Sequence, residues 1–207
     1  MKETMLLQRK ILGILCAVLT PSCILFGLLG DNLPYWYCSV SATYYANSKI
    51  CMIGLLAATS VFFFSYKGYD WKDRLLSCIQ AVAALGVIVF PCSTPMAPER
   101  TGLFNLSVNT SHIFHCISAC TLFFAFATNI MFLFTLGNNT NEQKRKRNII
   151  YRVCGGIIYA ICLWELVAGF LPIPQWFPLT MIDETIMLEA FAVAWLVKSE
   201  SVFKDRK

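Results

Sequence analysis

The chain has 207 residues, of which 57% are hydrophobic and only 14% are charged. A soluble domain of this size with that composition would expose too much apolar surface, so a soluble globular protein is excluded. The net charge of +5 does not indicate nucleic-acid binding, because the basic residues lie in short stretches that flank apolar segments. The composition predicts an integral membrane protein whose partners are membrane lipids and not nucleic acid.

Six apolar stretches long enough to cross a bilayer follow one another along the chain. They cover residues 11–30, 49–66, 75–92, 112–136, 150–171 and 181–198. No soluble domain is inserted between them, so we expect one domain over residues 1–207. The predicted fold class is all-α, an integral membrane bundle of six transmembrane helices.

The Lys and Arg residues alternate between the two sides of these stretches. Fifteen of the seventeen lie before the first stretch, between the second and third, between the fourth and fifth, or after the sixth, counting the edges of the stretches. Only Lys49 and Arg100 fall on the other side. Because cytoplasmic loops carry an excess of basic residues, the pattern predicts a multi-pass protein with both termini in the cytoplasm. We expect it in a plasma membrane, or the inner membrane of a bacterium.

The connections on the predicted outer side have a different character. Residues 31–47 contain five aromatic side chains, which is typical of a segment that lies against the membrane interface. Residues 172–178 contain three prolines and predict a stiff turn. Two of the ten cysteines, Cys38 and Cys92, lie near this side, whereas the other eight lie in the spans. In an oxidising compartment Cys38 and Cys92 would form a disulfide, and the alternative is two free thiols.

Four ionisable residues inside the spans are the candidate functional residues, because a charge in hydrocarbon costs about 3 kcal/mol. They are His112, His115, Glu165 and Glu189. A rise of 1.5 Å per residue places all four in the outer half of the membrane. This common depth predicts one polar site that opens outward.

Three interpretations of this site remain open. In the first, His112, His115 and one or both of Glu165 and Glu189 bind zinc and activate water, with His115, Glu189 and Glu165 as the catalytic candidates. In the second, His115 pairs with a buried carboxylate that fixes helix packing or moves a proton, without a metal or other cofactor. In the third, the histidines face interfacial water and the glutamates bond to neighbouring side chains.

Short motifs over nearly the whole chain resemble a known layout. They are the Pro-aromatic-Ser segment from Pro34 to Ser41, the histidine that opens residues 115–119 and the glutamate within residues 188–195. In these motifs the chain resembles the DRAM-like (damage-regulated autophagy modulator) membrane proteins. Residues 39–45, 64–70 and 195–198 are more similar still to six-span bacterial proteins of that layout. The resemblance implies a six-helix bundle with His115 and Glu189 as the positions most worth testing.

Together these observations predict a membrane protein with an outward-facing polar site, in a lipid-interacting or structural role. A metal-dependent membrane hydrolase that acts on a lipid amide or headgroup is the first alternative. The second alternative is a small channel or proton-coupled transporter. A six-helix chain is small for transport by itself, so this alternative requires a homo-oligomer.

Overall fold

The computed structural model describes residues 2–30, 38–68, 70–137, 142–169, 171 and 178–203. In these residues the chain forms six α-helices: α1 (Lys2–Gly30), α2 (Lys49–Ser65), α3 (Trp71–Val89), α4 (Val108–Thr128), α5 (Glu142–Ala168) and α6 (Leu179–Lys198). A short 3-10 helix, η1 (Ser41–Tyr45), precedes α2, and one π-helical turn, η2 (Asn129–Leu133), continues α4. The structure is mostly helical and has six α-helices, as predicted. The aromatic residues 35–37 and the proline-rich residues 172–177 lie outside the described residues.

The helices differ from the apolar stretches mainly at their ends. Helix α1 begins at Lys2 rather than residue 11, and α5 begins at Glu142 rather than residue 150. A hydropathy pattern marks only the apolar part of a helix, so it misses polar turns that extend the helix beyond that part. Helix α3 ends at Val89 instead of residue 92. Pro91, two residues on, has no N–H to continue the helical hydrogen bonding.

Within the part of the chain that the structure describes, three helical segments are long and apolar enough to cross a membrane: Glu3–Gly30, Val108–Leu133 and Glu142–Ala168. Helix α2 is apolar but shorter, with 17 residues. Helix α6 carries three acidic side chains, those of Asp183, Glu184 and Glu189. These features are those of a membrane protein. The crossing of the bilayer by all six helices and the side on which the termini lie stay predictions.

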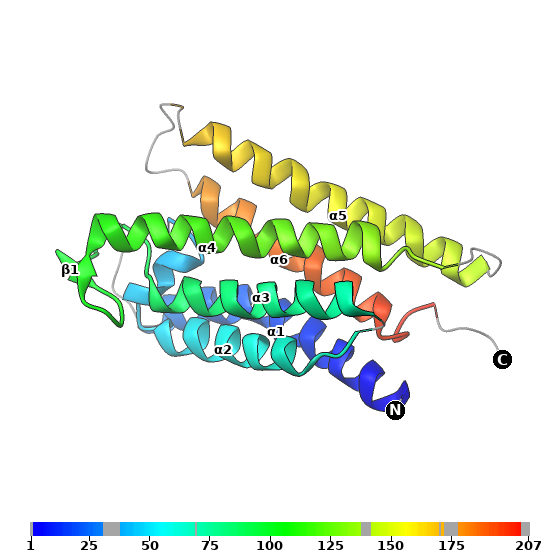
Figure 1. Ribbon diagram of the computed structural model, residues 1–207. Helices are drawn as coiled ribbons and strands as arrows, with labels where there is room; N and C mark the ends of the chain where they lie inside the picture. Colours follow the sequence, from blue (N-terminus) through cyan, green and yellow to red (C-terminus); the bar gives the residue numbers. More distant parts are fainter. Residues whose placement is uncertain are drawn as a thin grey trace.

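Each helix packs against its neighbours in the chain, and α6 packs against α1, so the six helices form a closed ring. Figure 1 shows that α1 begins and α6 ends at the same end of the bundle, which we call the termini end. The opposite end carries η1 and a two-stranded hairpin of β1 (Arg100–Thr101) and β2 (Leu106–Ser107). We call it the hairpin end. Strands β1 and β2 are antiparallel, with Arg100 opposite Ser107.

The core contains a cluster of aromatic rings. Phe63, Phe126, Phe191 and Trp195 come from three different helices, and the centroids of Phe126 and Phe191 are 3.9 Å apart. All four side chains are buried. Burying rings of this size contributes a large share of the packing energy of a helical bundle.

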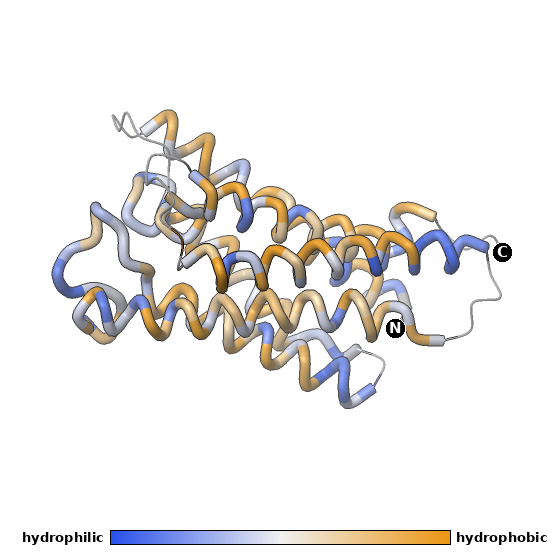
Figure 2. Tube along the Cα trace, turned by 90° about the horizontal axis from the view of Figure 1, so that it is seen from above, coloured by the Kyte–Doolittle hydropathy of each residue, from blue (hydrophilic) through white to orange (hydrophobic). Residues whose placement is uncertain are grey.

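The outer surface of the helices is apolar. Ile50, Val61, Val82, Ile117 and Leu163 all keep more than half of their surface exposed. Figure 2 shows hydrophobic residues along the middle of the helices and hydrophilic residues concentrated toward both ends. An apolar belt between two polar ends matches the profile of a bilayer.

Candidate functional site

The structure places three of the four candidate residues at the hairpin end. His112 and His115 lie in the first turns of α4, and Glu165 lies in the last turn of α5. Glu189 lies in the middle of α6, partly exposed, where its electrostatic neighbour is Cys16 on α1. It is five residues, or about 7.5 Å along the helix, from Glu184. Glu189 is therefore separated from the other candidates.

The backbone carbonyls of the three residues after α3 each accept a hydrogen bond from a side chain of α4 or η1. The ring Nδ1 of His115 lies 2.8 Å from the carbonyl oxygen of Phe90. The hydroxyl of Ser111 donates to the carbonyl of Pro91 at 2.8 Å, and Tyr45 donates to that of Cys92 at 2.9 Å. Because a carbonyl only accepts, Nδ1 of His115 carries the proton. His115 thus satisfies a backbone group released by the end of α3.

Tyr45 and His112 hold the same part of the chain. The hydroxyl of Tyr45 also lies 3.1 Å from Thr101 Oγ1 on β1. Burial raises the pKa of the Tyr45 phenol, which keeps it a neutral donor. His112 accepts the backbone N–H of Ser93 at its Nδ1, over 3.2 Å. Both histidines therefore fasten α4 to the residues that follow α3.

Glu184 makes the most extensive polar contact at this end. Its carboxylate accepts the backbone N–H of Val40 at 2.5 Å, the N–H of Ser41 at 3.2 Å and the hydroxyl of Ser41 at 3.1 Å. The side chain is buried. A buried carboxylate with three donors is well satisfied, so Glu184 anchors η1 to α6. Glu184 is not among the four candidates from the sequence, because no local motif marks its contact with residues 40 and 41.

Asp183 and Glu165 form a less complete contact between α6 and α5. The carboxyls of Glu165 and Asp183 are close enough to interact electrostatically. Glu165 Oε1 and Asp183 Oδ2 are both buried, and neither has a donor among the described residues. Two carboxylates repel each other in a site of low dielectric unless a proton or a donor lies between them. The pair can thus accept further hydrogen bonds.

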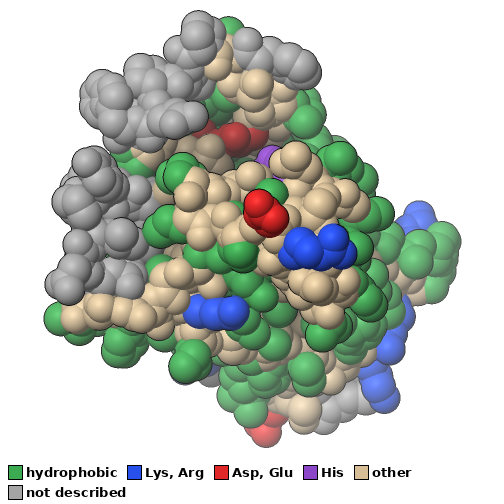
Figure 3. Space-filling view, turned by 90° about the vertical axis from the view of Figure 1, so that its left-hand side faces the viewer, with side chains coloured by type: hydrophobic (Ala, Val, Ile, Leu, Met, Phe, Trp, Pro, Cys, Tyr) green, Lys and Arg blue, Asp and Glu red, His purple; other side chains and the backbone are tan. Residues whose placement is uncertain are grey.

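The surface at this end of the bundle has a hollow, which we call the recess (Figure 3). Figure 3 views the hairpin end directly and shows acidic side chains beside a histidine in a hollow of this face. Glu184 and Cys116 are close enough to interact electrostatically, which places α6 near α4 here. The recess lies at the end of the bundle where α5 and α6 carry Glu165, Asp183 and Glu184 and where α4 carries both histidines.

The described residues contain no group of three or more His, Cys, Asp or Glu side chains that could hold a metal ion. His112 and His115 each use one ring nitrogen on the backbone, and Glu189 lies apart. Cys38 and Cys92 are free thiols in this structure, with Cys38 exposed and Cys92 buried. The zinc site and the disulfide stay predictions.

Comparison of the chain with known proteins finds no matching family model, no matching curated protein and no matching solved structure. The resemblance to DRAM-like proteins stays a prediction that depends on short motifs.

Proposed function

We propose that this chain is a six-span membrane protein that binds a membrane lipid in the recess at its hairpin end. The apolar belt supports an intramembrane position, because it would be costly to expose to water. The basic residues support the orientation: Arg9, Lys72, Arg74 and Arg147 lie toward the termini end, which we assign to the cytoplasm. The recess then faces outward.

The observation that carries the proposal is a pair of buried carboxyl oxygens, Glu165 Oε1 and Asp183 Oδ2, that have no donor among the residues the structure describes. A buried acceptor without a partner costs roughly 1 to 3 kcal/mol, and a charged one costs more. A headgroup that carries hydroxyl or amine donors would remove that cost. We favour a lipid as the source of this headgroup because exposed apolar side chains flank the two carboxyls, including Leu163, Leu166 and Ile182.

The test is the lipid content of the purified protein. The full chain is purified in mild detergent, and bound lipids are extracted and quantified per chain by mass spectrometry. We expect about one lipid with a hydroxyl- or amine-bearing headgroup per chain. A Glu165→Gln, Asp183→Asn double variant should lose it, because an amide supplies the donor that the lipid provides.

Glu142→Gln is the matched control. It makes the same acid-to-amide change at an exposed residue of α5 that pairs with Lys146 at 2.8 Å, at the other end of the helix. This variant should retain the lipid. If the double variant and the wild type are both folded and contain equal amounts of lipid, the lipid does not bind in the recess.

A further inference from the structure

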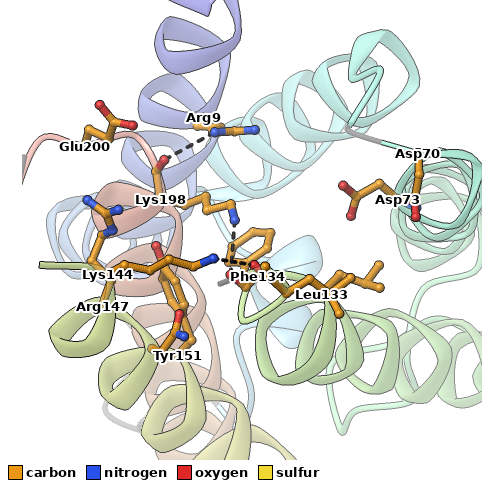
Figure 4. Close-up of a pocket in the computed structure, with 13 residues that line it drawn as sticks. Arg9, Asp70, Asp73, Leu133, Phe134, Lys144, Arg147, Tyr151, Lys198 and Glu200 are labelled. Atoms are coloured by element: carbon orange, nitrogen blue, oxygen red, sulfur yellow. Dashed lines mark hydrogen bonds between the residues drawn. The ribbon is translucent and has the colours of Figure 1, made fainter. Parts of the chain in front are cut away.

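A cavity of about 380 Å³ lies at the termini end, opposite the carboxyl recess. Figure 4 shows that its walls come from α1, α3, α5, α6 and the end of α4. Its volume lies within the range of about 300 to 1,000 Å³ that is usual for small-molecule sites. One of its lining residues, Leu136, is largely exposed, so the cavity reaches the surface.

Four cationic side chains line this cavity. They are Arg9 of α1, Lys144 and Arg147 of α5, and Lys198 of α6. Arg9 and Arg147 are buried, and Lys144 and Lys198 are partly buried. Asp70, Asp73 and Glu200 line the same cavity, so its lining has four cationic and three acidic side chains, an excess of one positive charge. An anion would interact favourably with that excess.

The ammonium groups of Lys198 and Lys144 both point toward the C-terminal end of α4. Lys198 Nζ donates to the carbonyl of Phe134 at 3.2 Å, and Lys144 Nζ donates to the carbonyl of Leu136 at 2.7 Å. In Figure 4 both groups approach the end of α4 beside the ring of Phe134. The π-helical turn η2 produces this position, because Phe134 N–H bonds to Asn129 O and the chain then leaves the helix. An ammonium has three donors, so that of Lys144 has protons left for a ligand.

Three acidic residues also line the cavity, and two of them have structural roles in α3. Asp70 caps the helix by accepting the N–H of Asp73 at 2.9 Å. Asp73 packs against Gly68, where an added Cβ would lie 2.3 Å from that of Asp73. Figure 4 places both on the wall opposite Lys144 and Arg147. The cationic side of the cavity is therefore formed by α5 and α6.

We propose that this cavity binds the phosphate of an anionic phospholipid headgroup, with Lys144, Arg147 and Lys198 as its cationic contacts. A phosphate matches the charge of these groups, and Arg147 already donates to the carbonyl of Phe203 at 2.7 Å, which holds its guanidinium in place at the wall. The acyl chains would lie on Phe132, Leu136 and Ile149, which are each more than half exposed. Lipid is favoured over a soluble phosphate compound because this apolar surface adjoins the cavity. The site goes beyond the proposed function, since it lies at the other end of the bundle.

The test is native mass spectrometry of the full chain in detergent, titrated with dioctanoyl phosphatidylglycerol. Dioctanoylglycerol, which lacks phosphate, and inorganic phosphate serve as the two comparison ligands. We expect saturable binding of the phospholipid that neither ligand reproduces. Equal binding of dioctanoylglycerol would overturn the phosphate site. Binding of inorganic phosphate as tight as that of the phospholipid would overturn the assignment to lipid.

Lys144→Gln and Arg145→Gln provide a matched pair of variants. They remove the same charge from adjacent residues, but only Lys144 lines the cavity, whereas Arg145 is exposed. Lys144→Gln should weaken binding about tenfold, and Arg145→Gln should change it little. Equal weakening in both variants would mean attraction by the basic surface as a whole and would overturn the site.

Discussion

The carboxylate of Glu184 accepts the backbone N–H of Val40 at 2.5 Å, although the two residues lie 144 positions apart. This contact joins the second turn of α6 to the residue that precedes η1. The carboxylate lies at the N-terminal end of η1, where free N–H groups favour negative charge. Glu184 therefore holds η1, which leads into α2, at the hairpin end of the bundle.

Glu184→Ala should destabilise the protein by roughly 3 kcal/mol, because the N–H groups of Val40 and Ser41 lose a charged acceptor in a buried position. Glu184→Gln keeps one acceptor oxygen and should therefore destabilise the protein less than Glu184→Ala. The measurement is the melting temperature of the protein in detergent. Glu99→Ala, an exposed glutamate at the same end, is the control. A melting temperature for Glu184→Ala equal to that of the control would contradict the anchoring role.

His115→Ala should lower stability by about 2 kcal/mol, since the carbonyl of Phe90 loses its donor and a cavity is left. We expect no stoichiometric metal in the purified wild type or in this variant, measured by inductively coupled plasma mass spectrometry. Glu189→Ala should leave metal content unchanged as well. About one zinc per chain, lost in both variants, would instead favour the metal-dependent hydrolase.

Adjacent glycines of α5 should respond to alanine in opposite ways. A Cβ on Gly155 would lie 2.8 Å from Cβ of Met131 and 3.2 Å from its backbone nitrogen, whereas one on Gly156 meets nothing within 4 Å. Gly155→Ala should cost about 1 to 3 kcal/mol by forcing α5 away from η2. Gly156→Ala should be neutral or stabilise by up to about 1 kcal/mol through helix propensity. Melting temperatures in detergent compare the two, and a similar loss in both would show that α4 and α5 do not approach closely here.

The orientation of the bundle can be tested by cysteine labelling of intact cells that express the protein. A membrane-impermeant maleimide should modify Cys38, which is exposed, and should modify Cys92 far less, because Cys92 is buried. A Lys72→Cys variant places an exposed thiol at the termini end and should react only after the cells are permeabilised. Modified peptides are identified by mass spectrometry. Reaction of the cysteine at position 72 in sealed cells would reverse the proposed topology.

Local sequence determined the helices themselves. Runs of apolar residues and the basic residues between them can be identified in the sequence without knowing which distant residues are in contact. The six helices can therefore be predicted from the composition and the hydrophobic periodicity of each stretch. Their ends were less well determined, because polar first turns such as those of α1 and α5 do not differ locally from loops. An even number of antiparallel helices also places α1's start and α6's end together, as Figure 1 shows.

The partners of the polar residues were decided only by the tertiary structure. The sequence indicated that His115 and Glu165 lie at one depth, but depth does not determine the direction in which a side chain points around its helix. Packing turned His115 toward Phe90, Glu165 toward Asp183 and Glu184 toward Val40. The cavity lined by Lys144 and Lys198 likewise exists only because α5 and α6 meet the end of α4. Such contacts depend on how distant helices pack, which composition and period along the chain do not encode.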